Sequence, residues 1–216
     1  MLSPLEKERL QRALIPKLTK YIKHTPTPKQ VAFLLYPGRE ALYGGSAGGG
    51  KSDALLMAAL QYVDVPGYAA LLLRKTYSDL ALPMALMDRA DQWLRGTDAH
   101  WDESTKTWAF PSNATLTFGY LESEKDKYRY QSAEFQFIGF DELTQFSEGQ
   151  YRYLFSRLRR LKDHSVPLRI RAASNPGGDG HNWVKQRFIA GQYDLSKRIF
   201  IPAKLSENPH LDQAEY

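Results

Sequence analysis

A short glycine-rich segment, Gly44 to Ser52, constrains the fold of this chain more than any other part of the sequence. It reads Gly-Gly-Ser-Ala-Gly-Gly-Gly-Lys-Ser and contains the phosphate-loop pattern G-x-x-x-x-G-K-[ST], which begins at Gly45 and ends at Gly50, Lys51 and Ser52. Glycines leave backbone N–H groups free to surround an anion, and a helix that begins at the lysine directs its positive end toward the same anion. The segment therefore predicts a phosphate-binding loop.

The flanks of the loop distinguish it from a flexible glycine linker. Glu40 to Tyr43 is typical of a short strand, and Asp53 to Val63 is typical of an apolar helix. Strand, loop and helix in that order are the context that the pattern requires. We therefore expect Lys51 to bridge the β- and γ-phosphates of a nucleoside triphosphate, and the hydroxyl group of Ser52 to hold Mg²⁺.

Length and composition exclude several classes of protein. The chain has 216 residues, which suits one domain with appendages, and its lack of cysteine excludes disulfide bonds and thiolate metal sites. The sequence contains neither a membrane-spanning run nor the apolar core of a signal peptide, so we expect a soluble, intracellular protein. The net charge of +5 permits a polyanionic partner without demonstrating one.

Two helices are expected before the loop. Ser3-Pro-Leu-Glu6 is typical of a helix start, and Lys29 to Tyr36 indicates a second, short helix. Gln30 lies in this second helix, and its amide group presents a donor and an acceptor that match an adenine edge. A solvated glutamine fits the sequence equally well, so both interpretations stay open here.

After the loop, apolar strands alternate with helices, which predicts a central, mainly parallel sheet with helices on its faces. The expected strands are residues 69–73, 135–141, 168–174 and 198–201, and the expected helices are residues 78–94, 147–161 and 182–190. Two β-prone runs, 105–110 and 114–120, predict an antiparallel hairpin at the edge of the sheet. Residues 122–130 are charged and indicate a surface loop or a short helix.

Two adjacent carboxylates, Asp141 and Glu142, follow the apolar strand that begins at Phe135. An aspartate at the carboxyl end of a strand can hold Mg²⁺ through water, and the next glutamate can polarise an attacking water molecule. A charged junction between a strand and a turn is the simpler interpretation, but the strongly apolar run before it makes that less satisfactory. The pair favours hydrolysis of the bound triphosphate.

The next predicted strand ends at Ser174 and Asn175. Beside the strand that ends at Asp141, this tip would lie near the γ-phosphate, where Asn175 would sense the phosphate or the attacking water. The sequence Asn-Pro-Gly-Gly also forms a turn without any further role, so both interpretations stay open.

Hydrolysis also requires an arginine that stabilises the negative charge developing on the transferred phosphoryl group. Arg74 at a strand tip and Arg129 before the strand that ends at Asp141 are the candidates, although any one arginine is more often a surface residue. Contacts with a polyanion would involve an arginine-bearing face of the 147–161 helix or the lysines of the N-terminal region, namely Lys17, Lys20 and Lys23. A charged helix face is also commonly just a solvated face.

Six parts of the chain follow the order seen in a known family. They are Gln30, Gly45 to Ser52, Arg74-Lys-Thr-Tyr77, Tyr128-Arg-Tyr130, Phe137-Ile-Gly-Phe-Asp-Glu142 and Ser174-Asn-Pro176. In this order the chain, over nearly its whole length, resembles the ATPase domain of phage large terminase subunits. The resemblance implies an ASCE-type P-loop ATPase that works as a ring on the portal of an empty capsid and drives double-stranded DNA inward, with ATP and Mg²⁺ as cofactors.

The resemblance also implies a role for each residue. Asp141 would hold the metal with Ser52, Glu142 would be the catalytic carboxylate, and Ser174 and Asn175 would form the motif that couples hydrolysis to movement. The remaining nucleotide contacts would come from Gln30 at the adenine, from Lys51 at the phosphates, and from the loop residues Gly45, Ser46, Ala47, Gly48, Gly49 and Gly50.

The loop departs from the family at one position. Many relatives carry an arginine where Ala47 stands. Arg129 matches the arginine that several members offer to the ATP of a neighbouring subunit, so the resemblance implies that Arg129 acts in trans. Arg74 is the second candidate.

By the same resemblance the chain divides into three parts. Residues 1–38 would form an N-terminal helical segment with the adenine-side motif, residues 39–205 the ATPase core, and residues 206–216 the start of a linker toward a nuclease domain that this chain lacks, so we expect no nuclease activity.

The expected partners are double-stranded DNA, the portal protein, the small terminase subunit and further copies in a ring, with a monomer in isolation left open. The expected location is the host cytoplasm, without a membrane.

Other classes share parts of this pattern. A helicase or another nucleic-acid translocase has the same loop and carboxylate pair, and in a P-loop kinase the run Arg157-Leu-Arg-Arg160 would form a lid. A nucleotide-gated binding switch explains Glu142 poorly, and the sequence lacks the Asn-Lys-x-Asp motif that reads guanine.

Overall fold

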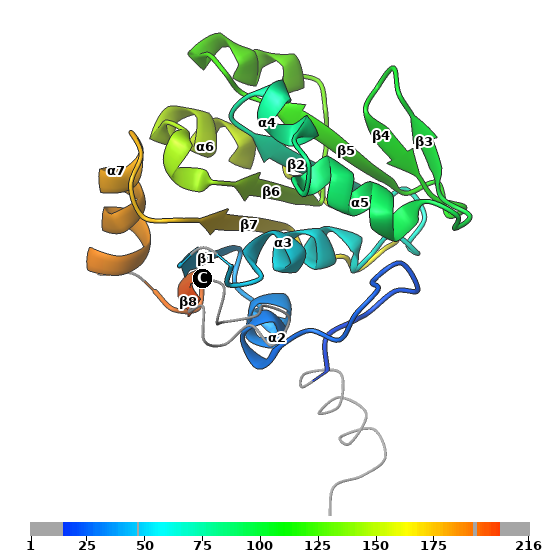
Figure 1. Ribbon diagram of the computed structural model, residues 1–216, viewed down its shortest axis with the longest axis horizontal. Helices are drawn as coiled ribbons and strands as arrows, with labels where there is room; N and C mark the ends of the chain where they lie inside the picture. The colour runs from blue at the N-terminus through cyan, green and yellow to red at the C-terminus, as the bar shows by residue number, and fades with distance from the viewer. Residues whose placement is uncertain (1–14, 47, 192–193, 204–216) are drawn as a thin grey trace, which may run out of the picture.

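The computed structural model describes residues 15–46, 48–191 and 194–203 of the chain (Figure 1). The expected helix start at Ser3, the loop residue Ala47 and the expected linker at residues 206–216 lie outside the described residues.

A mainly parallel sheet of eight strands forms the centre of the described part of the chain. The strands are β1 (Glu40–Gly45), β2 (Ala69–Arg74), β3 (His100–Asp102), β4 (Thr107–Ala109), β5 (Thr115–Tyr120), β6 (Phe137–Asp141), β7 (Arg169–Ser174) and β8 (Arg198–Ala203). Their order is β3-β4-β5-β2-β6-β7-β1-β8. The six strands from β5 to β8 in this order run parallel, and β3 and β4 join antiparallel at one edge.

Helices cover both faces of the sheet (Figure 1). They are α2 (Pro28–Leu35), α3 (Lys51–Leu60), α4 (Tyr77–Ala81), α5 (Leu86–Leu94), α6 (Glu148–Phe155) and α7 (His181–Lys185), with the 3₁₀-helical segments η1 (Glu124–Tyr130) and η2 (Leu143–Gln145) and the π-helical segment η3 (Gln186–Ala190). One apolar core lies between the sheet and α2, α3 and α5, and a second lies between the sheet and α6, η2 and η3. No helix of the described residues combines the length and apolarity needed to cross a bilayer.

Strand β2 shows why its sequence is continuously apolar. Ala70 and Leu72 pack into the core beneath α3, whereas Leu71 and Leu73 pack into the core beneath α6. Successive side chains of a strand point to opposite faces, so a strand that is covered on both faces needs apolar residues at every position. The prediction of a doubly buried strand is confirmed.

The helix expected at residues 78–94 is two helices, and the prediction of one is wrong. Helix α4 ends at Ala81 and α5 begins at Leu86. Pro83 lacks a backbone N–H and excludes helical geometry from the residue before it, and Leu82 accordingly has an extended ψ of 149°. Leu82 lies in this break and is 52% exposed.

The helix expected at residues 147–161 also ends early, at Phe155. Beyond it the chain turns back and pairs with Phe135, whose N–H donates to the carbonyl of Arg157 at 2.9 Å and whose carbonyl accepts from the N–H of Arg159 at 3.0 Å. Arg157, Arg159 and Arg160 therefore do not lie on a helix face, which corrects that expectation.

The predicted hairpin is confirmed as β4 and β5, and the structure adds a strand that the sequence did not reveal. Strand β3 pairs antiparallel with β4, and the rings of Trp101 and Trp108 lie 5.4 Å apart across this pair. The helix expected at residues 182–190 is present as α7 followed by the π-helical turn η3.

Two buried arginines attach the segment between α2 and β1 to the sheet. Arg171 is fully buried and donates to the carbonyls of Tyr36 at 2.7 Å, Gly38 at 3.2 Å and Arg39 at 3.2 Å. Arg169 donates to the carbonyl of Leu34 at 3.0 Å. The carbonyls of Leu34 and Tyr36 lie at the C-terminal end of α2, where carbonyls lack partners within the helix and a cation is favourable.

We expect the variant Arg171→Met to lower the free energy of unfolding by about 3 kcal/mol, because it leaves several buried carbonyls without a donor. Urea denaturation measures the change. The matched control is Arg95→Met, whose side chain is 78% exposed and which should change stability by less than about 0.5 kcal/mol. Equal unfolding midpoints for the two variants would contradict the role of Arg171.

Candidate nucleotide-binding site

The three motifs that the sequence singled out meet at one edge of the sheet. The phosphate loop follows β1, Asp141 ends β6, and Ser174 ends β7, which lies between these two strands. Gly44 is level with Ser174, and Asp141 is level with Ala173. Because the three strands are parallel, the loop, the carboxylate pair and Asn175 all follow carboxyl ends, where open α/β sheets bind ligands.

Backbone geometry explains two of the loop glycines. Gly45 has a φ of +138°, and a Cβ atom on it would stand 2.1 Å from the carbonyl oxygen of Ala203 in β8. Gly50, with a φ of +69°, precedes the first turn of α3 and lies against Gln30. A side chain at either position would be strained, so glycine is required by the backbone itself.

Lys51 begins α3 and is 8% exposed. Its ammonium group donates to the carbonyl of Ser46 across the loop. Burial lowers the pKa of Lys51, and the carboxylates of Glu142 and Asp141 act in the opposite direction. The lysine and the N-terminus of α3, where Ser52 lies in the first turn, therefore both direct positive charge toward the loop.

Asn175 holds the carboxylate of Glu142 with two hydrogen bonds. Its side-chain amide donates to Oε1 at 2.8 Å, and its backbone N–H donates to Oε2 at 3.1 Å. Glu142 has a left-handed backbone with a φ of 53°, so the extended conformation of β6 ends at this residue. The other side-chain atom of Asn175, Oδ1, is buried and has no partner among the described residues.

Ser174 connects the end of β7 to the turn after Glu142. Its hydroxyl group accepts from the backbone N–H of Thr144 at 3.2 Å and lies 3.0 Å from the hydroxyl of Thr144. Ser174 is 3% exposed, so it contacts η2 and not the open edge of the site. Sequence reasoning missed Thr144, whose only local signal is its position two residues after the carboxylate pair.

Asp141 is buried at 2% exposure and forms an ion pair with Arg74 at the end of β2. Burial raises the pKa of Asp141, and the Arg74 guanidinium acts in the opposite direction. No three His, Cys, Asp or Glu side chains converge anywhere in the described ranges. The carboxylate of Asp141 and the hydroxyl of Ser52 are the oxygen ligands that Mg²⁺ prefers, and Mg²⁺ commonly completes its shell with water and substrate phosphates. The residues therefore fit this ion.

Gln30 is buried at 3% exposure, so its interpretation as a solvated glutamine is wrong. Its Oε1 accepts from the N–H of Thr27 at 2.8 Å, and its Nε2 donates to the carbonyl of Gly50 at 2.9 Å. The amide thus links the start of α2 to the phosphate loop. Contact with an adenine stays a prediction.

The structure does not bring Arg129 to the phosphate loop of its own chain. Arg129 lies in η1 after β5, and β5 is four strands away from β1, a separation of about 19 Å at the usual spacing of strands. The side chain is 47% exposed, pairs with Asp126 at 2.8 Å and lies 4.3 Å from the ring centroid of Tyr120. It therefore occupies an open surface at the same edge of the sheet.

Comparisons with known proteins agree with this arrangement. Residues 42–209 match the family described as terminase large subunit, T4likevirus-type, N-terminal. No curated protein sequence matches the chain. The fold is similar to that of the large terminase from the thermophilic bacteriophage D6E, with a TM-score of 0.65 and 14% sequence identity over 88% of this chain and 48% of the other. It is also similar to the bacteriophage HK97 large terminase, with a TM-score of 0.60 and 15% identity over 95% of this chain and 48% of the other. For the large terminase ATPase domain of Thermus phage P74-26, the TM-score is 0.60 and the identity 13% over 91% of this chain and 92% of the other.

These likenesses confirm the predicted ASCE-type P-loop fold. The chain spans about half the length of the first solved large terminases that it matches, with 48% of their length covered. Structures of the protein from the thermophilic phage include complexes with ADP and with ATP-γ-S.

We expect Gln30→Glu to lower the free energy of unfolding by about 2 kcal/mol, because a carboxylate cannot donate to the Gly50 carbonyl and is costly to bury. Chemical denaturation measures this change. Gln186→Glu, which makes the same substitution at an exposed site, is the control and should leave stability unchanged. If both variants unfold at the same denaturant concentration, the link between α2 and the loop contributes nothing.

Proposed function

The chain belongs to the family of terminase large subunits, and from this membership we propose that it is the ATP-hydrolysing motor domain that drives double-stranded DNA into a procapsid. The observation that carries the proposal is the convergence of Lys51, Asp141 and Glu142 at the carboxyl edge of the sheet, around the phosphate loop. The nucleotide complexes of the related phage protein support ATP as the ligand.

In the proposed reaction, the N–H groups of the loop and Lys51 bind the β- and γ-phosphates of ATP. Mg²⁺ held at Asp141 and Ser52 would neutralise charge on the phosphate oxygens. The oxygen of a water molecule forms a bond with the γ-phosphorus, the bond from that phosphorus to the bridging oxygen breaks, and Glu142 accepts a proton from the water. The products are ADP and inorganic phosphate.

Asn175 gives this site a means of sensing the reaction. In the structure its two donors occupy both oxygens of the Glu142 carboxylate. These two hydrogen bonds fix the orientation of the Glu142 carboxylate. We propose that Asn175 exchanges this contact for the γ-phosphate or the attacking water, and that Ser174 transmits the change to η2.

Two arginines are proposed to supply the remaining positive charge. Arg74 neutralises Asp141 within the same chain, and Mg²⁺ would compete with it for this carboxylate. Arg129 follows β5, which is separated from β1 by about 19 Å at the usual strand spacing, and its side chain is 47% exposed, which suits a role at the nucleotide of a neighbouring subunit in a ring. We propose Arg129 as the residue that acts in trans.

The wider setting is also a proposal. The division at residues 38 and 205, the portal protein and small terminase subunit as partners, and the host cytoplasm as the location all rest on family membership. A packaging assay tests the function directly, with the chain as part of its complete terminase. Protection of duplex DNA from nuclease inside portal-bearing procapsids should require ATP, and release of single strands would indicate a helicase instead.

Glu142→Gln should retain ATP binding and lower steady-state hydrolysis by about 100-fold or more, because it removes the proton acceptor and keeps the shape of the side chain. Fluorescent-nucleotide titration and phosphate release, measured on assembled motors, separate the two effects. Glu122→Gln, at an exposed position, is the control. Normal turnover in the Glu142 variant would refute its catalytic role.

Arg129→Ala should abolish hydrolysis in uniform rings and should be partly rescued when it is mixed with Asp141→Ala subunits. A mixed interface can combine an intact Asp141 from one variant with an intact Arg129 from the other. Lys125→Ala, at an exposed position of the same short helix, controls for changes in η1. Mixed rings that stay inactive at every ratio would leave Arg129 without a role in trans.

A further inference from the structure

A groove with a volume of about 720 Å³ lies at the amino-terminal edge of the sheet. Its walls are the starts of β1 and β8 and the connection from α6 to β7. The phosphate loop follows the opposite end of β1. A strand of six residues is about 20 Å long, so the groove and the nucleotide edge are separated by roughly this distance.

The groove is strongly cationic. Arg39, Arg160, Lys197 and Arg198 line it, and Glu40 is the one carboxylate among the lining residues. Arg39 and Arg160 are exposed, and neither forms an ion pair with a carboxylate in the described ranges. Lys197 has only a 3.4 Å contact with Asp194 on the adjacent turn.

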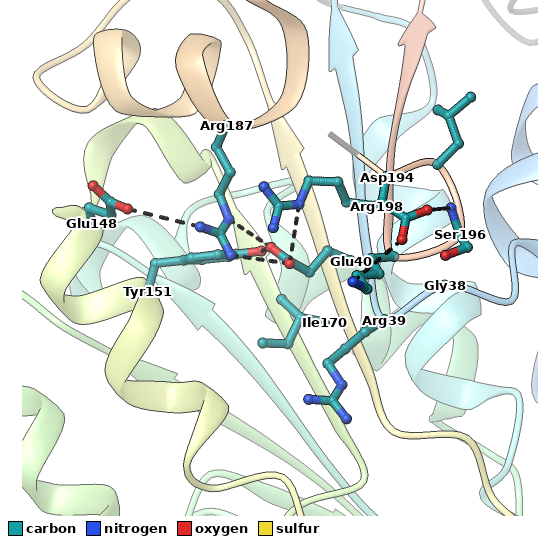
Figure 2. Close-up of polar contacts among 12 residues, drawn as sticks. Gly38, Arg39, Glu40, Glu148, Tyr151, Ile170, Arg187, Asp194, Ser196 and Arg198 are labelled. Carbon is teal, nitrogen blue, oxygen red and sulfur yellow. Dashed lines mark hydrogen bonds and ion pairs between the residues drawn. The ribbon is translucent and has the colours of Figure 1, made fainter. Parts of the chain in front are cut away.

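The carboxylate of Glu40 does not offset these charges, because other groups already use it. Figure 2 shows Arg187 against this carboxylate, with its Nε at 2.7 Å from Oε2 and its Nη2 at 3.1 Å from Oε1. The hydroxyl of Tyr151 donates to Oε2 at 3.0 Å. Arg198 approaches Oε1 only to 3.5 Å, and the guanidinium of Arg39 points away from this cluster (Figure 2).

The other basic residues that the sequence suggested for a polyanion are largely neutralised. Lys17 pairs with Asp64 at 2.6 Å, and Lys20 pairs with Asp98 at 2.6 Å. Arg152 contacts Glu148 at 3.5 Å. Arg39 and Arg160 differ from these residues, because both line the groove and neither has a carboxylate partner in the described ranges.

The chemistry of the groove favours a phosphate backbone over a protein segment. Guanidinium groups present planar pairs of donors that match phosphate oxygens. Protein interfaces usually also offer large apolar anchors. Phe155, Val166 and Leu168 do line the groove, but none of them is among the large hydrophobic residues that stand exposed on the described chain.

We propose that this groove binds the phosphodiester backbone of duplex DNA. The choice of a duplex rests on the proposed function, whereas the choice of a phosphodiester backbone rests on the charge of the groove alone. Contacts with the backbone carry no sequence information, which suits a protein that must hold DNA of any sequence.

The test compares the full chain with the double variant Arg39→Gln/Arg160→Gln. Fluorescence anisotropy with a labelled duplex of about 20 base pairs, between about 50 and 200 mM salt, gives the affinity and its salt dependence. We expect the double variant to lose about tenfold or more in affinity and its slope of log K against log salt to decrease by about 1.8, or 0.9 for each lost phosphate contact. The matched control, Arg95→Gln/Arg152→Gln, removes the same charge from side chains that are 78% and 68% exposed outside the groove.

The proposal would be overturned by no binding of the duplex to the unchanged chain, by equal losses in the two double variants, or by competition from a polyglutamate peptide and not from unlabelled DNA. Competition by inorganic phosphate at low concentration would likewise assign the groove to a small anion. ATP binding, measured on the same samples, should be unchanged in the double variant because the groove lies at the opposite edge. A chain that binds duplex through the groove but hydrolyses no ATP would refute the motor function and leave this site standing.

Discussion

The parallel pairing of β7 between β1 and β6 determines where every polar group of the nucleotide edge lies. The register sets Ser174 level with Gly44 of the loop and places Asn175 one residue beyond it, beside the end of β6. From this point the amide of Asn175 reaches Glu142 at 2.8 Å. Glu142 keeps a left-handed backbone, which costs of order 1 kcal/mol or more for a residue with a side chain. The two hydrogen bonds from Asn175 help to stabilise this conformation.

Local patterns in the sequence were sufficient to predict each motif of the site that follows the end of a single strand. The loop, Asp141 with Glu142, and Ser174 with Asn175 all follow short apolar runs, and parallel strands collect such ends at one edge. The pair of Arg74 and Asp141 was not predictable in this way, since it requires β2 to lie next to β6. The pairing of Phe135 with Leu158, which ends α6 early, is likewise a long-range contact. Pro83 is visible in the sequence and indicates a helix break. The apolar residues on both sides of it repeat at a helical spacing, and that pattern led to the prediction of one continuous helix.

Arginines occupy three different environments in this fold, and the net charge of the chain does not show which arginine lies in which environment. Arg171 is fully buried and holds the carbonyls that follow α2. Arg187 neutralises the buried Glu40. Arg39 and Arg160 remain exposed without a carboxylate partner in the described chain. A formal charge of +5 therefore does not describe how a polyanion would meet this protein. The relevant quantity is the local excess of cations that stays unpaired after the internal contacts have formed.

Strands β1 and β8 run from the groove at one end of the sheet to the phosphate loop at the other. At their amino ends Glu40 is level with Arg198, beside the groove. At their carboxyl ends Gly45 is level with Ala203, and the carbonyl of Ala203 accepts from the N–H of Ser46 in the phosphate loop at 3.2 Å. A continuous parallel ladder joins the two ends, so β1 and β8 are constrained to move together. Close contact between Gly45 and Ala203 leaves no space for a Cβ atom there. A relative shift of these strands would therefore alter the loop as directly as it would alter the spacing of the cations in the groove.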